Sequence, residues 1–307
     1  MIKFLKLFVK FVPFAIVVYC ILIFVTGRYL PAIATPNILN KAIVGHTFSR
    51  LKEAKETDNV DVLFLGSSHT YRGFDPRIFA EEGWRSFNLG SSAQTPLQTE
   101  ILLDRYLERL NPKMIVYEVY PTTFSIDGVE SFVDILYNDR VDMKSLWKVL
   151  GLWNIRLYNT LLYQFLRDPF NARSEYIEPM YIDGDTYVTG GYVEKDISYF
   201  EKENFRTQSW DFNDSQFQAF ENTLSIIRKK DIPLVLVFAP ITSALYDSYS
   251  NNDAFDDVMH GYGDYLNFNE IIELNDTLHF FDSNHLNQKG VVVFNHEFIR
   301  ILRDKGF

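Results

Sequence analysis

The sequence predicts an α/β protein whose mostly parallel, five-stranded sheet is covered by helices on both faces and preceded by an N-terminal transmembrane helix. Three observations support this prediction. Short apolar segments alternate with helix-like segments along residues 60–120 and again along 214–304, the pattern of a parallel sheet. One uncharged apolar run lies near the N-terminus. The chain has 307 residues, of which 47% are hydrophobic and 23% charged, a globular composition.

The N-terminal apolar run is long enough to cross a bilayer. Residues 11–27 carry no charge, and flanking apolar positions extend the run to 7–30, close to the roughly 20 residues that a span needs. Three lysines precede the run, so we expect a single-pass protein of the cytoplasmic membrane with its N-terminus inside and its main domain outside. The alternative is a signal peptide cleaved at Ala32–Ala34.

Charge and cysteine content exclude several classes of protein. The net charge is −10, and residues 1–27 contribute three lysines and no acid, so the rest of the chain carries −13. An acidic chain without basic runs is not expected to bind nucleic acid. The lone cysteine, Cys20, lies inside the apolar run, which excludes an intrachain disulfide. No nucleotide-binding or metal-ligand motif is present, so we expect neither cofactor nor metal.

Residues 31–59 are expected to form a connector, with a helical stretch near 48–55, and 60–307 to form the main domain. Its strands are expected to be short apolar runs, at 60–65, 86–90, 114–120, 233–238 and 278–281. Its helices are expected where apolar positions repeat at helical spacing, at 76–83, 97–110, 214–230 and 288–304.

Local signals set several of these boundaries. Asp75 followed by Pro76 predicts the start of a helix that Gly83 ends. Residues 247–264 are expected to form a polar, acidic loop. In the last helix four apolar side chains are expected to face the core: Val292, Phe294, Phe298 and Ile299.

An aromatic-rich insert is expected at about 121–212. It holds one amphipathic helix near 143–152 and a glycine-punctuated hairpin over 181–192. Its aromatic side chains could stack on sugar rings, but we expect them to be core. They are Trp147, Trp153, Tyr158, Tyr163, Tyr176 and Tyr181.

Three polar segments follow predicted strands, at the sheet edge where parallel sheets bind ligands. In Gly66–Thr70, a hydroxyl on a strand-to-helix turn is placed for a nucleophile. In Asn88–Ser92, the glycine allows close backbone approach to a bound group. In Asp282–Asn287, an acid stands three residues before a histidine and can orient its ring. Each segment alone is also compatible with an ordinary turn or solvated loop.

Taken together, these segments resemble the SGNH (GDSL-type) hydrolase superfamily. Residues 62–68, VLFLGSS, are similar to the family's first block, and matching by position makes Ser68 the nucleophile. Asp282 and His285 match the acid and base of its last block. Gly90 matches the glycine of the second block, whose N–H helps to form an oxyanion hole.

The resemblance covers about 60–120 and 230–305 but not the insert. It implies a three-layer, SGNH/flavodoxin-like fold and a serine mechanism without cofactor. The oxyanion would be held by the N–H groups of Ser68 and Gly90.

The third block departs from the family pattern. The family usually carries Gly-x-Asn-Asp after the third strand, with the asparagine as an oxyanion donor, whereas residues 117–121 here read YEVYP. An ionised Glu118 cannot donate, and losing one such donor typically costs about 3–4 kcal/mol in the transition state. Gln94, Asn88 and Tyr120 are alternative donors.

Other residues near the predicted nucleophile are candidate substrate contacts. His69 could touch a substrate oxygen and Arg72 could bind an anionic group. The same role is open to Gln94, Glu118 and Tyr120.

A similar departure in the third block occurs in membrane-anchored proteins that look like the teichoic-acid D-alanyl transfer protein and the alginate O-acetylation proteins. That resemblance implies esterolysis or acyl transfer, with acetyl expected, on cell-envelope polysaccharide. It also implies an acylated glycan or acyl donor and a multi-pass membrane partner. The alternative is a non-catalytic glycan-binding or scaffold protein that keeps the fold.

Overall fold

The computed structural model describes residues 1–30, 44–167 and 177–307, and these fall into two compact units. The smaller unit comprises the described residues of 1–42 and 132–178, and the larger one those of 43–131 and 179–307. The alternative cleavage site at Ala32–Ala34 and the aromatic Tyr176 lie outside the described residues.

The larger unit is built on a five-stranded sheet in the order β2-β1-β3-β7-β8, and every neighbouring pair is parallel. This confirms the predicted fold class. The strands are β1 (Val62–Leu65), β2 (Ser86–Asn88), β3 (Met114–Glu118), β7 (Leu234–Phe238) and β8 (Tyr265–Asn267). Because all five run the same way, their carboxyl ends share one edge.

The helices of the larger unit alternate with these strands, as predicted. The longer ones are α2 (Thr47–Ala54), α5 (Pro96–Leu110), α10 (Asp214–Arg228), α12 (Asn252–Tyr262) and α15 (Gln288–Asp304). The shorter ones are η2 (Val44–His46), α3 (Ser68–Gly73), α4 (Pro76–Glu81), α6 (Pro121–Ser125), α11 (Ser243–Tyr246), α13 (Phe268–Ile271) and α14 (Asp276–His279).

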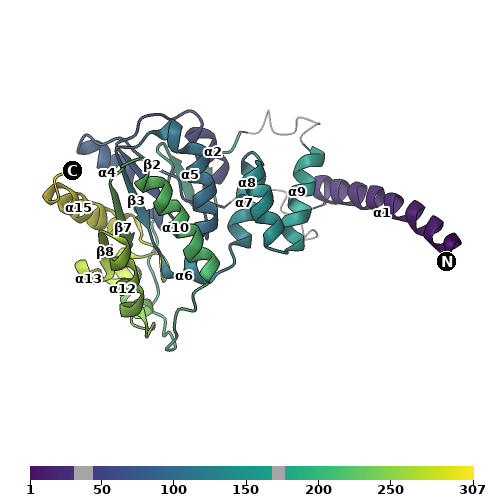
Figure 1. The fold of residues 1–307 in the computed structure, drawn as a ribbon. Coiled ribbons are helices and arrows are strands. Elements are labelled where there is room, and N and C mark those ends of the chain that lie inside the picture. Colours follow the sequence, from purple (N-terminus) through teal and green to yellow (C-terminus); the bar gives the residue numbers. More distant parts are fainter. Residues whose placement is uncertain (31–43, 168–176) are drawn as a thin grey trace. The chain divides into compact units, whose positions relative to one another are not determined.

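The two faces of the sheet are covered by different helices. Helices α5 and α10 lie side by side across one face (Figure 1), where Tyr117 of β3 packs on Phe220 with ring centroids 5.2 Å apart. On the other face, valines and a phenylalanine of β1, β3 and β7 form one core with α4 and α15. Alternate residues of each strand therefore face opposite layers, as period-two geometry requires.

The predicted hairpin forms a small antiparallel sheet of three strands, β4 (Tyr181–Ile182), β5 (Asp185–Val188) and β6 (Tyr192–Lys195). It packs on α3, where Tyr187 and Val193 share a buried cluster with Tyr71. The hairpin therefore stands directly beside the turn that follows β1.

The fifth strand is not at 278–281, as expected, but is β8. Asn275 caps a helical turn there, because its side chain accepts a hydrogen bond of 2.9 Å from the N–H of Leu278. Within that run Phe280 makes a single antiparallel bridge, to Leu286. Leu278 itself is 44% exposed, so the run does not form a buried strand.

Two smaller expectations are also wrong. The acidic stretch expected as a loop contains α12, which buries Phe255 and Met259 four residues apart and leaves Asp253 and Asp257 exposed. In α15, Val292 faces solvent and Val291 takes its place in the core. Phe294, Phe298 and Ile299 are buried, as predicted.

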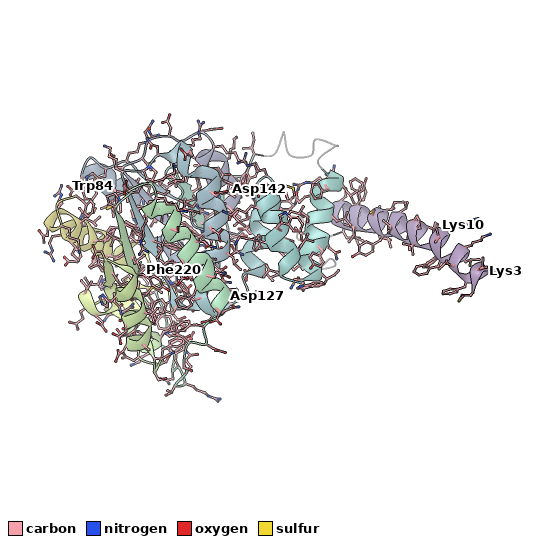
Figure 2. All side chains as sticks on the ribbon, in the orientation of Figure 1. Lys3, Lys10, Trp84, Asp127, Asp142 and Phe220 are labelled. Atoms are coloured by element: carbon pink, nitrogen blue, oxygen red, sulfur yellow. The ribbon has the colours of Figure 1, made fainter. Side chains whose placement is uncertain are left out.

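The smaller unit contains α1 (Ile2–Tyr29), α8 (Met143–Gly151) and α9 (Ile155–Arg167), and α7 (Val129–Asn138) spans the boundary between the two ranges. Helix α1 is long and apolar enough to cross a membrane. Figure 2 shows its side chains projecting around the helix, with Lys3 and Lys10 toward its N-terminal end.

The aromatic side chains of the insert do not all belong to the core. Tyr163 is buried, but Trp147, Trp153 and Tyr181 are exposed, which corrects the expectation for these three. Tyr158 is half-buried and donates to the backbone oxygen of Leu150.

Arg50 of α2 joins the connector region to the sheet edge. Its side chain is fully buried and donates to the carbonyl oxygens of Gly191 (2.8 Å), Gly90 (3.1 Å) and Gly45 (2.6 Å). The guanidinium also lies over the ring of Tyr71. One side chain thus fixes three loops, including the one that carries Gly90.

Replacing Arg50 with methionine keeps the apolar stem and leaves three buried carbonyls without this donor. Because each unsatisfied buried polar group costs about 1–3 kcal/mol, we expect Arg50→Met to lower the free energy of unfolding by roughly 3 kcal/mol or more. Thermal unfolding of the full chain in detergent measures this. The control is Arg109→Met, because Arg109 is exposed and donates one 3.3 Å bond. Equal melting temperatures for both variants would contradict the role of Arg50.

Candidate active site

The turn after β1 presents Ser68 at the carboxyl edge of the sheet. Gly66 adopts φ +141°, and a Cβ there would lie 2.6 Å from the Glu118 carboxylate, so the position requires glycine. Ser67 is the N-cap of α3 and is buried, whereas Ser68 is the first helical residue and is partly exposed. The chain therefore turns so that the second hydroxyl, not the first, reaches the surface.

The loop between α14 and α15 carries Asp282 and His285 to the same edge. The Asp282 carboxylate accepts hydrogen bonds from the backbone N–H groups of Asn284 (2.9 Å) and His285 (2.7 Å), which folds the loop on itself. Asn287 then begins α15, because its side chain accepts from the N–H groups of Lys289 and Gly290.

Ser68, His285 and Asp282 form one chain of hydrogen bonds. The Ser68 Oγ lies 2.8 Å from His285 Nε2, and His285 Nδ1 lies 2.9 Å from Asp282 Oδ2. Burial alone would raise the pKa of Asp282, but its bonds with His285 and the backbone lower it below its ordinary value. An ionised Asp282 fixes the proton on Nδ1 and leaves Nε2 free to accept the hydroxyl proton of Ser68.

Gly90 lies directly against the nucleophile turn. A Cβ at this position would meet the carbonyl oxygens of Ser67 at 2.5 Å and Gly66 at 2.9 Å, so no larger residue fits. Within the described residues, the backbone N–H groups of Gly90 and Ser68 donate to no backbone carbonyl. Both N–H groups therefore suit the oxyanion role that the sequence predicts for them.

Glu118 is buried beneath the nucleophile turn, where its side chain is hydrogen-bonded to Ser67. Its side chain is buried, and Oε2 lies 3.0 Å from the Ser67 N–H and 2.9 Å from the Ser67 Oγ. Burial raises the pKa of Glu118 to about 7, although hydrogen bonds from Ser67 and the Tyr120 backbone counter part of this shift. The candidate substrate contact at Glu118 is thus corrected to a structural one.

His69 links the nucleophile turn to the loop of Asp282 and His285. Its Nε2 lies 2.6 Å from the carbonyl oxygen of Asn284, and its Nδ1 lies 3.1 Å from the Ser67 Oγ. The ring stacks on that of His285, with centroids 4.9 Å apart. Burial and the neighbouring His285 lower the pKa of His69 to about 3, so the ring is neutral near pH 7.

Counting protons along this chain assigns a proton to Glu118. A carbonyl only accepts, so the neutral His69 carries its proton on Nε2 and accepts on Nδ1. The single hydroxyl proton of Ser67 cannot serve both His69 Nδ1 and Glu118 Oε2. A protonated Glu118 supplies the second proton from Oε2, and each contact of the chain Glu118–Ser67–His69–Asn284 then joins one donor to one acceptor.

The other candidate contacts have partners inside the protein. Arg72 forms a two-bonded ion pair with Asp185 of β5, at 2.7 and 3.0 Å, so it joins α3 to the hairpin. Gln94 is buried and donates to Thr99 and Leu89. Both side chains therefore hold the fold together here, and their contact with a substrate stays a prediction.

The alternative oxyanion donors differ in whether their polar groups are bonded inside the protein or lie near the site. Asn88 is fully buried, and its amide donates to the carbonyl oxygens of Phe74 and Gly190. Tyr120 packs its ring on His69, with centroids 4.3 Å apart, and its hydroxyl lies near the side chains of Thr122 and Asn284. Of the three alternative donors, only Tyr120 has its polar group at the loop that carries Asp282 and His285.

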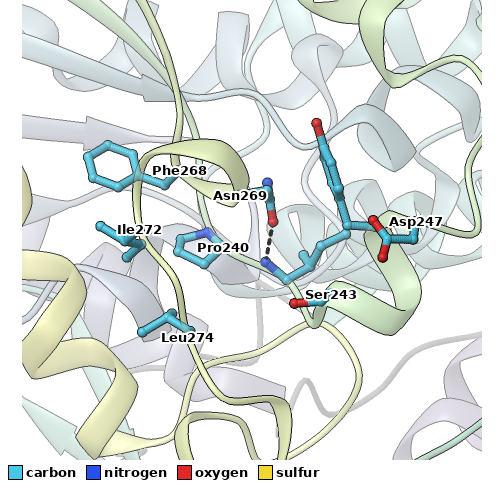
Figure 3. Close-up of a pocket in the computed structure, with 9 residues that line it drawn as sticks. Pro240, Ser243, Asp247, Phe268, Asn269, Ile272 and Leu274 are labelled. Carbon is cyan, nitrogen blue, oxygen red and sulfur yellow. Dashed lines mark hydrogen bonds between the residues drawn. The ribbon is translucent and has the colours of Figure 1, made fainter.

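A cavity of about 260 Å³ lies beyond the carboxyl ends of β7 and β8. Figure 3 shows Phe268, Ile272 and Leu274 on one side of it and Ser243, Asn269 and Asp247 on the other. Its remaining lining residues are Pro240, Ile241 and Tyr246.

The wall of this cavity is tied to the loop of Asp282 and His285. Thr242, between two lining residues, donates from its N–H and its hydroxyl to the carbonyl oxygen of Ser283, at 3.1 and 2.7 Å. The cavity and the Ser68 chain therefore share one edge of the sheet.

Sequence reasoning missed three contributors to this site. Ser67 and the Asn284 carbonyl connect the two loops, and Arg50 holds the carbonyl of Gly90. No spacing rule signals a buried contact between residues 69 and 284. The sequence offered one indication that Arg50 has a structural role, namely that a large charged residue stands on an otherwise apolar face of a helix.

Comparison with known proteins gives a likeness of structure alone. No family model matches the chain, and no curated protein matches it. A solved structure named as an acylhydrolase, from Bacteroides fragilis, is similar with a TM-score of 0.42 and 11% identity, over 86% of this chain and 99% of that one. A GDSL-like lipase from Bacteroides thetaiotaomicron has a TM-score of 0.42 and 12% identity, over 85% and 98%.

The proton on Glu118 makes stability depend on pH. The pKa of its carboxyl is about 7 in the fold, against 4.5 ordinarily, so between these values the folded protein keeps a proton that the unfolded chain has lost. Stability therefore falls as pH rises through this window and levels off above it. We expect wild type to lose roughly 3 kcal/mol that Glu118→Gln does not lose.

Thermal unfolding of the two proteins, followed from about pH 5 to about pH 8, measures this difference. The matched control is Glu108→Gln, because Glu108 is exposed. Wild type and Glu118→Gln curves that run parallel over the whole range would show that Glu118 is ionised in the fold.

Proposed function

We propose that this protein is a serine esterase or O-acyltransferase anchored in the cytoplasmic membrane, with its main domain outside the cytoplasm. The observation that carries the chemistry is the chain from Ser68 through His285 to Asp282, with contacts of 2.8 and 2.9 Å. A partly exposed hydroxyl, a histidine and an ionised carboxylate in this order are the parts of an activated nucleophile.

The reaction proceeds in two steps. Ser68 Oγ attacks the acyl carbon as its proton passes to His285 Nε2, and Asp282 stabilises the imidazolium that forms. The N–H groups of Ser68 and Gly90 hold the oxyanion. His285 returns the proton to the leaving oxygen, which leaves an acyl group on Ser68.

The acceptor decides the outcome of the second step. His285 takes a proton from the acceptor, whose oxygen attacks the acyl carbon and releases Ser68 Oγ, which regains its proton from His285. Water as acceptor gives hydrolysis, and a sugar hydroxyl gives a new ester.

The proposed substrates are acyl esters, acetyl above all, of cell-envelope polysaccharide. Support comes from α1, which is long and apolar enough to tether the domain to a membrane, close to where such polymers emerge. The partner in this scheme is a multi-pass membrane protein that supplies the acyl group, and this part of the proposal rests on the resemblance alone.

A second candidate function is favoured by the third strand. Glu118 binds Ser67, so β3 supplies no side-chain donor to an oxyanion. A non-catalytic glycan-binding or scaffold protein would tolerate this loss, whereas an enzyme would need Tyr120 or another group to offset it.

The serine mechanism is tested with a fluorophosphonate probe and p-nitrophenyl acetate on the full chain in detergent. We expect wild type to label and to turn over the ester. Ser68→Ala should abolish labelling, and both Ser68→Ala and His285→Ala should lower turnover by about 10³-fold or more.

Ser225→Ala provides the control, because Ser225 is an exposed serine of α10 and takes no part in the Ser68 chain or in its buried support. It should still label. A folded wild-type protein that neither labels nor turns over ester, but binds glycan equally well with Ser68→Ala, would favour the binding protein over the enzyme.

A further inference from the structure

We propose that residues 140–156, which we call the basic amphipathic segment, lie on the surface of an anionic lipid bilayer beside the point where α1 leaves it. This inference rests on the proposed membrane anchoring by α1. The segment comprises α8, the turn after it and the first residues of α9.

The segment exposes an apolar stripe. Met143, Trp147 and Leu150 stand at positions i, i+4 and i+7 of α8, and they are 63%, 67% and 42% exposed. The stripe continues into the turn with Trp153, 88% exposed, and Ile155. Two tryptophans on one surface are costly in water but suit the level of lipid headgroups.

The other side of α8 is already occupied. Ser145 and Val149 are buried, and α8 packs on α9. The exposed stripe is therefore a second apolar face of an already packed helix. A helix with one face in a protein core and an apolar face outside needs a further apolar or interfacial environment.

The charge of the segment is opposite to that of the chain. It holds four basic residues and one acid, a net charge of +3, whereas the whole chain carries −10. Lys144 and Lys148 lie next to the stripe on α8, and Arg140 and Arg156 lie at its ends. Basic side chains flanking exposed tryptophans match an anionic membrane surface.

The segment belongs to the same compact unit as α1. Helix α9 packs on α1, where Tyr19 donates to the Asn159 side chain, Ile23 is buried with Tyr163, and Gly27 leaves room for the Tyr163 ring. These contacts lie in the C-terminal half of α1.

That location sets the level of the segment. A 28-residue helix is about 42 Å long, whereas the hydrocarbon core is about 30 Å thick. With its lysines at the cytoplasmic side, α1 meets α9 along its outer half, toward the side where α1 leaves the bilayer. The turn 152–154 joins α9 to α8, so the stripe begins at the same level.

The experiment uses the environment-sensitive fluorophore NBD on single cysteines in the full chain. Cys20 is the only native cysteine, so Cys20→Ser gives a background without thiols. Trp153→Cys carries the label in the segment, Phe14→Cys carries it inside α1, and Asp253→Cys carries it on exposed α12. Each protein is reconstituted in phosphatidylcholine vesicles with or without phosphatidylglycerol, and quenching by lipids brominated on the acyl chain is measured.

We expect brominated lipid to remove about half of the emission at position 153, more with phosphatidylglycerol, and to leave position 253 unchanged. Quenching at 14 without quenching at 153 would overturn the inference and keep the anchor. Absence of quenching at both would overturn both. Equal quenching at 153 and 253 would also overturn it, because the whole surface would then adsorb.

Two further measurements test the role of the lysines and separate this inference from the proposed enzymatic function. Lys144→Gln with Lys148→Gln should reduce the extra quenching that phosphatidylglycerol gives at position 153. Labelling of Ser68 by the fluorophosphonate probe on the same vesicles reports the proposed enzymatic function separately, so failure of one proposal is distinguishable from failure of the other.

Discussion

A buried chain of hydrogen bonds, from the Glu118 carboxyl through Ser67 and His69 to the carbonyl of Asn284, holds the site together. It connects the end of β3, the turn after β1 and the loop before α15, which are far apart in the sequence. Each buried polar group in it would cost about 1–3 kcal/mol if left unpaired. The 2.8 Å contact between Ser68 and His285 depends on this link, because both partners stand on loops that it joins.

The same edge is held from a second side. Arg50 binds the carbonyl of Gly90, and Arg72 joins α3 to Asp185 of the hairpin. Arg72 was a candidate for binding an anionic group, but it pairs with Asp185 inside the fold, and Arg50 likewise donates to buried carbonyl oxygens. Both arginines are bound by carbonyl or carboxylate groups of the protein itself. The polar groups at the surface of the site are therefore those of Ser68 and of the loop that carries Asp282 and His285.

The sequence predicts the fold well where one signal dominates. The buried strands β1 and β7 are apolar runs in the sequence, and Asp75 with Pro76 marks the start of α4 where the structure has it. Failures occur where composition and position disagree. The run 278–281 is apolar but is opened by the cap of Asn275, and α12 is acidic because only its inner face, Phe255 and Met259, touches the core. The spacing of apolar residues alone does not show whether a side-chain cap will start a helical turn in a run that could also form a strand.

The candidate site shows a sharper division. Ser68, Gly90, Asp282 and His285 could be named in advance because each follows a recognisable block and all are brought to one edge by parallel topology. Glu118 could not, because its role depends on a neighbour 51 residues away. From the sequence alone, a glutamate at the position of the asparagine indicates only that one oxyanion donor is missing. In the structure Glu118 binds Ser67, and the proton that we assign to Glu118 completes the pairing of Ser67 and His69. The departure in the third block therefore exchanges an oxyanion donor for a support under the nucleophile turn.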